Sequence, residues 1–248
     1  MTRRLVYLVA TVFILASAAI TKAAPETDFA AANQAYAEGR FADAVTGYEN
    51  VVRAGKWHAN VFYDQGNAFY RLGNFGKAIL NYERALSLDP RHPEAEANLR
   101  LAQDEARALE LRKTWIERYA AMATIGQYLI AGMIAFWLTI FLFLHWYFDR
   151  RRSWGRRALI ALSILVCAAS AFGIFTLENG VRGEALAVVT GKDTEARVAT
   201  ADSAKSILLL PAGSEIKVLS ERGDWIYVSL PNEQRGWIPA SSAERVRL

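Results

Sequence analysis

Three long apolar runs constrain this chain more than any other feature of its sequence. They span residues 5–20, 123–147 and 158–177. The hydrophobic fraction of the whole chain is 53%, and its apolar residues concentrate in these runs. The second and third runs are each long enough to cross a hydrocarbon core of about 30 Å as a helix. Unpaired backbone polar groups are costly in lipid, so we expect both runs to be transmembrane helices.

The first apolar run has the features of an export signal over residues 1–24. Arg3 and Arg4 supply the charged start, and small residues precede Pro25. Cleavage after Ala23 is one possibility, and an uncleaved anchor is the other. Either arrangement places residue 25 and the residues after it outside the cytoplasm.

A basic loop at residues 148–157 separates the second and third runs. It contains five arginines, and such loops remain on the cytoplasmic side. Both outer ends of this hairpin are then extracytoplasmic, in agreement with the signal. We therefore expect a protein of the bacterial inner membrane with both soluble segments in the periplasm. The net charge of +4 reflects this loop, and nucleic acid is not an expected partner.

An internal repeat occupies the segment between the first two runs. Gly39, Phe41 and Ala44 recur 34 residues later as Gly73, Phe75 and Ala78. This period is typical of paired antiparallel helices, in which glycine ends the first helix and alanine allows close packing of the second. The other matched pairs are Asn33 with Asn67, Tyr36 with Tyr70, and Tyr48 with Tyr82.

At these residues the segment 25–118 resembles the tetratricopeptide repeat family. Phe62, Gly66, Phe69 and Pro90 add to the match of the second copy, and a third, capping helix is expected from Pro93. The resemblance implies a groove, lined by the first helix of each repeat, that binds peptides or proteins. The candidate groove residues are Phe29, Asn33, Tyr36, Asn60, Tyr63, Asn67 and Tyr70. Packing roles are an alternative explanation for the asparagines and tyrosines.

The pattern changes from helical to alternating in residues 182–248. Residues 215–219 and 225–230 are expected strands, joined by a turn at 222–224, and residues 236–239 are expected to close a small barrel. The segment resembles the bacterial SH3 domain family in Leu210–Gly213, Val218–Leu219, Gly223–Val228 and Gly236–Ile238. Trp225, Tyr227 and Trp237 are the candidate surface of this SH3-like barrel, although packing roles are equally compatible with these residues.

No catalytic, cofactor or metal site is expected from the sequence. It has no nucleophile motif, phosphate-binding loop or metal-ligand spacing. The single cysteine, Cys167, lies within an apolar run, and the three histidines are scattered. We therefore expect a non-enzymatic multidomain protein with all-α tetratricopeptide hairpins, two transmembrane helices and an all-β SH3-like barrel.

This order of segments is similar to that of the BatE-type proteins of the aerotolerance (Bat) operon family. The similarity implies a membrane-anchored scaffold in an envelope complex with a MoxR-type ATPase, linked to stress tolerance. The implied protein partners are other membrane or periplasmic proteins, including membrane proteins with von Willebrand A domains. Membrane lipid is a further expected partner, because the apolar runs lie in the bilayer. The alternative is a wall-tethering protein whose SH3-like domain binds peptidoglycan.

Overall fold

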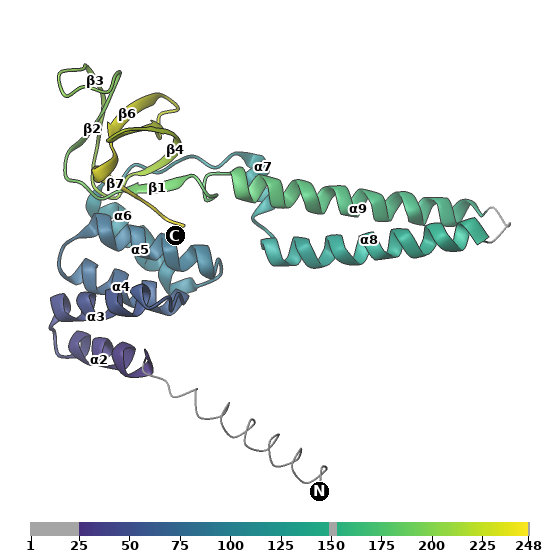
Figure 1. The fold of residues 1–248 in the computed structure, drawn as a ribbon, viewed down its shortest axis with the longest axis horizontal. Helices are drawn as coiled ribbons and strands as arrows, with labels where there is room; N and C mark the ends of the chain where they lie inside the picture. Colours follow the sequence, from purple (N-terminus) through teal and green to yellow (C-terminus); the bar gives the residue numbers. More distant parts are fainter. Residues whose placement is uncertain (1–24, 149–152, 248) are drawn as a thin grey trace, which may run out of the picture.

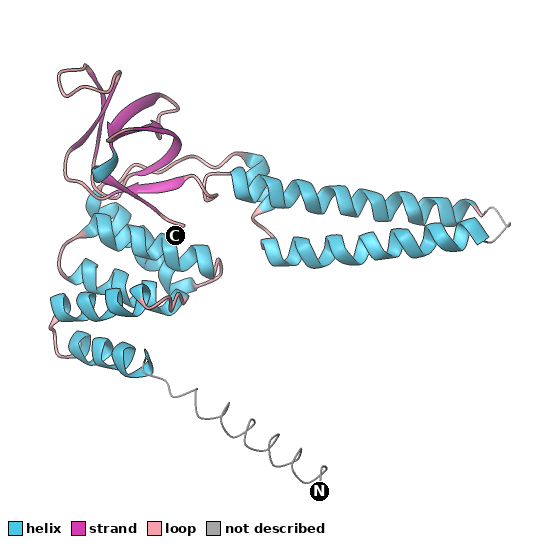
Figure 2. Ribbon diagram, in the orientation of Figure 1, coloured by secondary structure: helices cyan, strands magenta, loops and turns pink. Residues whose placement is uncertain are grey.

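The computed structural model describes residues 25–148 and 153–247. The expected signal at residues 1–24 and residues 149–152 of the basic loop lie outside this range. The described chain forms three parts (Figure 1): a helical stack of α2–α6, an apolar hairpin of α8 and α9, and a β-domain of β1–β7. Figure 2 shows the β-domain above the helical stack, with the apolar hairpin extending away from both.

The helical stack consists of two helix pairs and a further helix. Its elements are α2 (Pro25–Ala37), α3 (Phe41–Arg53), α4 (Ala59–Arg71), α5 (Phe75–Leu88) and α6 (Pro93–Ala106). Gly39 and Gly73 follow the first helix of each pair with φ of +79° and +71°. The next residue at each place donates its backbone N–H to a carbonyl five residues earlier, which closes the helix end. The glycine-ended helix pairs expected from the repeat are confirmed.

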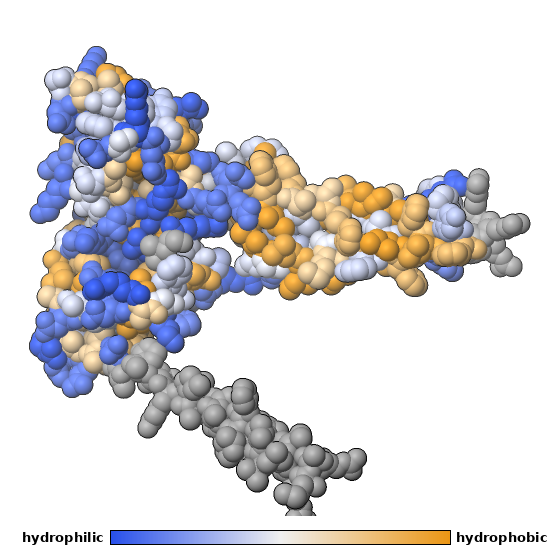
Figure 3. All heavy atoms as spheres, in the orientation of Figure 1, coloured by the Kyte–Doolittle hydropathy of each residue, from blue (hydrophilic) through white to orange (hydrophobic). Residues whose placement is uncertain are grey.

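The apolar hairpin consists of α8 (Ile125–Phe148) and α9 (Trp154–Asn179). Small and hydroxyl side chains allow the two helices to approach closely. A Cβ atom on Gly132 would lie 3.2 Å from that of Ser170, and the Thr139 hydroxyl donates to the Ser163 Oγ atom at 2.7 Å. The large apolar side chains point outward (Figure 3). Both helices are long and apolar enough to cross a membrane, which suggests membrane association.

The β-domain is one seven-stranded antiparallel sheet with the order β3-β2-β6-β5-β4-β1-β7. The expected strands are present as β4, β5 and β6, and the expected turns separate them. The strand bounds are β1 Leu186–Val189, β2 Thr194–Arg197, β3 Ser206–Leu210, β4 Glu215–Arg222, β5 Trp225–Ser229, β6 Arg235–Pro239 and β7 Ala243–Arg245. The antiparallel sheet is established, and its closure into a barrel stays a prediction.

Strand β1 joins the β-domain to the helical stack. All four of its residues are buried. Leu186 and Val188 pack into the core of the helical stack, whereas Ala187 and Val189 pack into the core of the sheet. Alternate side chains of a strand point to opposite faces, so β1 supplies one face to each core. The two soluble segments therefore form one packed body.

Candidate functional site

The seven predicted groove residues lie on the first helices of the two repeats. Phe29, Asn33 and Tyr36 are on α2, and the other four are on α4. Helix α4 packs beside both α2 and α6, so the first helices of successive units lie side by side. The structure thus places all seven residues on adjacent helices. Their binding of a partner stays a prediction.

Two of the predicted asparagines have a packing role. The Tyr48 hydroxyl donates a hydrogen bond to Asn33 Oδ1 at 2.7 Å, and the Tyr82 hydroxyl donates to Asn67 Oδ1 at 2.8 Å. Burial raises the pKa of both tyrosine hydroxyls, which therefore remain protonated donors. The repeat of this bond at the 34-residue period explains why both positions carry asparagine.

Helix α6 occupies part of the expected groove of the second repeat. Asn98 Nδ2 donates to Asn67 Oδ1 at 2.9 Å and to the Tyr63 hydroxyl at 3.3 Å. The His92 ring lies 4.9 Å from the Tyr63 ring and contacts Asn60 Oδ1 at 3.3 Å. The sequence analysis did not identify these roles of Asn98 and His92. His92 lies 34 residues after His58, but its contacts with Tyr63 and Asn60, like those of Asn98, depend on how α6 packs on α4.

Asp64 is a groove candidate that the sequence analysis missed. It lies on α4, and burial raises the pKa of its carboxyl group to about 6, opposed by the charge of His92. Within the described residues, neither Asp64 nor the hydroxyls of Tyr36 and Tyr70 have a hydrogen-bond partner. The aromatic rings of these tyrosines pack edge-on against Phe41 and Phe75. This leaves one carboxylate and two hydroxyls available to a ligand.

The three aromatic residues predicted for the β-domain surface lie on one face of β5 and β6. Trp225 and Tyr227 are alternate residues of β5 and are half-buried, whereas Ile226 and Val228 between them are buried on the other face. Tyr227 pairs with Trp237 across the strands, with ring centroids 4.9 Å apart. The trio forms a partly exposed aromatic strip, whose ligand stays a prediction.

Buried polar contacts join the helical stack to the β-domain. Glu215 of β4 accepts hydrogen bonds from Gln103 of α6 and from the backbone N–H of Leu111, both at 3.1 Å. The adjacent Ser214 hydroxyl accepts from the Leu109 N–H at 3.1 Å. Residues 108–111 therefore lie against the sheet at the junction. The hydrogen bonds from Leu109 and Leu111 stabilise it, because a buried N–H group without an acceptor is costly.

Acidic and basic groups are also buried at this junction. Glu83 of α5 is 1% exposed and pairs with Arg182 at 3.0 Å. Burial raises the pKa of Glu83, and the charge of Arg182 opposes this change. Burial and the nearby charge of Glu83 raise the pKa of Glu215 to about 7. Arg84 adds an ion pair to Glu244 of β7 at 3.3 Å.

Comparison with known protein families identifies a tetratricopeptide repeat at residues 59–92. This range covers α4, α5 and the following turn as far as His92. A comparison with curated proteins gave no match. The chain is thus a protein with a tetratricopeptide repeat, two long apolar helices and a C-terminal antiparallel sheet. The repeat suggests interaction with protein partners.

Replacement of Tyr82 by phenylalanine tests the packing role of the groove asparagines. We expect Tyr82→Phe to lower the free energy of unfolding by about 1 kcal/mol, because Asn67 loses a partly buried hydrogen bond from the Tyr82 hydroxyl. Urea unfolding of the purified protein in detergent measures this loss. Tyr119→Phe is the matched control, since Tyr119 is 67% exposed. Equal stability of both variants would contradict the packing role.

Proposed function

We propose that this protein is a non-enzymatic, membrane-anchored adaptor that presents two protein-binding surfaces on the extracytoplasmic side of a bacterial inner membrane. The first surface is the groove on α2 and α4, and the second is the aromatic strip of the β-domain. The packing of the helical stack directly on the β-domain is the main support for this proposal. Because β1 belongs to both cores, the two surfaces are held in a constant relative position.

The contacts at the base of the apolar hairpin support the proposed anchoring. Glu117 of α7 (Trp115–Ala120) accepts from the backbone N–H of Val181, just after α9, at 2.8 Å. Lys217 of β4 donates to the Asn179 carbonyl at the end of α9. Gln127 at the start of α8 accepts a long hydrogen bond of 3.4 Å from Arg91 of the helical stack, so both apolar helices contact the soluble body at the same end. An adaptor held this way keeps both surfaces near the membrane, where two weak contacts with one partner combine into a stronger one.

The free polar groups of the groove favour a partner segment rich in hydrogen-bond donors. Asp64 supplies a carboxylate, and Tyr36 and Tyr70 supply hydroxyls beside aromatic rings. A carboxylate accepts strong hydrogen bonds from lysine, arginine or an amino terminus. We therefore propose that the groove takes an extended basic peptide segment from another membrane or periplasmic protein.

The order of segments supports a more specific proposal. An export signal, a short tetratricopeptide stack, an apolar hairpin with a basic loop and an SH3-like domain resemble the BatE-type proteins of the aerotolerance operon family. We propose that this chain is such a protein, with von Willebrand A-domain membrane proteins as partners. The five arginines of the 148–157 loop support the proposed orientation, with that loop in the cytoplasm.

Affinity purification of the tagged full-length protein from native membranes tests the adaptor proposal. The groove variant combines Tyr36→Phe, Asp64→Asn and Tyr70→Phe, which remove two hydroxyl groups and one negative charge and keep the aromatic rings. We expect the wild type to enrich membrane proteins with von Willebrand A domains. We expect the groove variant to recover at least roughly tenfold less of them, since three weakened hydrogen bonds at about 0.5–1.5 kcal/mol each lower the binding free energy by about 1.5 kcal/mol or more.

A matched control carries Tyr119→Phe and Asp202→Asn, two similar changes at exposed positions outside the groove. It should recover partners as well as the wild type does. Equal recovery by the groove variant would exclude the groove as the binding surface. Sedimentation of the full-length protein with purified cell-wall sacculi tests the alternative. Binding that Trp237→Ala abolishes would favour the peptidoglycan-tethering function over the adaptor function.

A further inference from the structure

A cleft of about 590 Å³ lies where the helical stack, the β-domain and the apolar hairpin meet. Leu86 and Leu88 of α5 line one side, and Val246 and Arg247 after β7 line another. Ile125 at the start of α8 and Leu177 near the end of α9 line the side toward the apolar hairpin. The cleft thus opens at the level where both apolar helices enter the soluble body.

The charged lining of this cleft has an excess of basic side chains. Arg91, Lys113, Arg182 and Arg247 line it, together with Glu83, Glu96 and Glu117. Each acidic group already has a partner. Glu83 pairs with Arg182, and Glu96 pairs with Arg100 at 3.5 Å. Glu117 accepts from the neutral backbone N–H groups of Thr114 and Val181, so one negative charge in the lining has no ion-pair partner among the described residues.

Two of the basic side chains have no such partner. Among the residues that the structure describes, neither Lys113 nor Arg247 forms an ion pair. Arg91 makes only a long hydrogen bond of 3.4 Å to the amide oxygen of Gln127, a neutral group. The cleft therefore combines unpaired positive charge with an apolar wall, a combination that fits a ligand with an anionic end and an apolar end.

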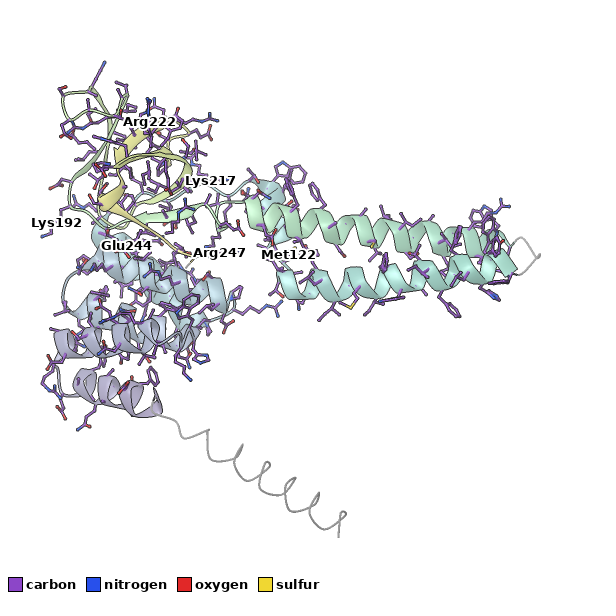
Figure 4. All side chains as sticks on the ribbon, in the orientation of Figure 1. Met122, Lys192, Lys217, Arg222, Glu244 and Arg247 are labelled. Carbon is purple, nitrogen blue, oxygen red and sulfur yellow. The ribbon has the colours of Figure 1, made fainter. Side chains whose placement is uncertain are left out.

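The surroundings of the cleft indicate that this ligand is a lipid. Trp115, Tyr119 and Met122, which lie in and just after α7, are 65%, 67% and 74% exposed beside the ends of the apolar hairpin. Exposed aromatic rings at this position are typical of the headgroup layer of a membrane. Figure 4 labels Met122 beside the inner end of the apolar hairpin and Arg247 at the edge of the soluble body.

We propose that this cleft binds the headgroup of an anionic phospholipid. Lys113 and Arg247 hold the phosphodiester, and the acyl chains leave along Ile125 and Leu177 into the bilayer. This inference rests on the proposed membrane anchoring of the apolar hairpin. A bound lipid would fill the space between the apolar hairpin and the soluble body and would hold the body in one orientation above the membrane.

Native mass spectrometry of the full-length protein in detergent, titrated with phosphatidylglycerol or phosphatidylcholine, tests the proposal. We expect retained phosphatidylglycerol on the wild type and much less retained phosphatidylcholine. Lys113→Gln combined with Arg247→Gln should weaken phosphatidylglycerol binding roughly 25-fold, because each basic side chain near an anionic lipid contributes about fivefold. Neither side chain makes a bond that the fold needs, so we expect this variant to fold.

Lys192→Gln combined with Arg222→Gln is the matched control, since both residues are exposed on the β-domain away from the cleft (Figure 4). It should retain phosphatidylglycerol as the wild type does. Equal binding by the cleft variant would overturn the proposal. Stronger retention of glycerol phosphate than of phosphatidylglycerol, when both are offered at equal concentration, would also overturn it, because the cleft would then be a site for a soluble phosphate.

Carbonate extraction of native membranes separates this inference from the proposed function. A wild-type protein that resists extraction but shows no preference for phosphatidylglycerol would refute the lipid site alone. A protein that carbonate releases from the membrane would refute the proposed anchoring, and the lipid site with it.

Discussion

The substitution Gly213→Val should lower the free energy of unfolding by about 2–5 kcal/mol, because it weakens the attachment of the helical stack to the β-domain. Gly213 has a φ of +95°, a backbone conformation that is costly for any residue with a Cβ atom. A Cβ atom at this position would overlap the Cδ1 atom of Ile79 and would lie 3.4 Å from the Cβ atom of Ala108. The expected loss of stability therefore has two causes, the strained backbone at position 213 and the overlap with Ile79.

Gly223→Val is the matched control for this prediction. Gly223 also has a positive φ, +56°, but a Cβ atom there would have no neighbour within 4 Å. Urea unfolding of the purified protein in detergent measures both variants, and limited proteolysis of residues 107–114 reports separation of the two parts. We expect faster cleavage in Gly213→Val alone. Equal destabilisation of the two variants, without added cleavage, would mean that packing across the junction contributes nothing.

The stability of the junction should decrease as the pH rises from about 4.5 through 7. Burial raises the pKa of Glu215 to about 7, from an ordinary value of 4.5. The folded protein therefore holds this proton more tightly than the unfolded chain does. The resulting stabilisation is fully present below about pH 4.5 and is lost above pH 7, with a magnitude of the order of 3 kcal/mol. Glu83, whose pKa is also raised, acts in the same direction.

Urea unfolding between pH 5 and pH 8 tests this pH dependence. Glu215→Gln should flatten the curve, because the amide cannot lose a proton and its oxygen still accepts the hydrogen bond from Gln103. Glu105→Gln, at an exposed position on α6, should leave the curve unchanged. Parallel curves for the wild type and Glu215→Gln would show that the Glu215 carboxyl group does not control the junction.

Local sequence patterns predicted the separate parts of this protein well. The 34-residue repeat predicted the helix pairs, because Gly39 and Gly73 end helices through their own backbone conformation. The apolar runs predicted α8 and α9, because a helix satisfies all backbone hydrogen bonds within a long apolar segment. The alternation at residues 215–219 and 225–230 predicted β4 and β5. Strand β5 buries one face, whereas β4 also buries Glu215 beside Ile216.

Strand β1 was not expected from the sequence, although residues 186–189 are apolar. A strand that buries both faces shows no alternation, so its pattern does not distinguish it from other apolar segments. Similarly, the sequence does not distinguish Asp64 from the other polar residues of α4, because its partial burial is visible only in the structure. The groove asparagines were identified by their period, but their bonds to Tyr48 and Tyr82 depend on the packing of each helix pair.

The sequence by itself determined which segments are helices, which strands alternate and which runs are apolar enough for a membrane, because these properties depend on neighbours along the chain. The tertiary structure alone decided that the helical stack and the β-domain share a core and enclose a basic cleft. Glu215 meets Gln103 and Leu111 across more than a hundred residues of sequence. Such contacts follow from the burial of complementary surfaces in three dimensions, and no local pattern encodes them.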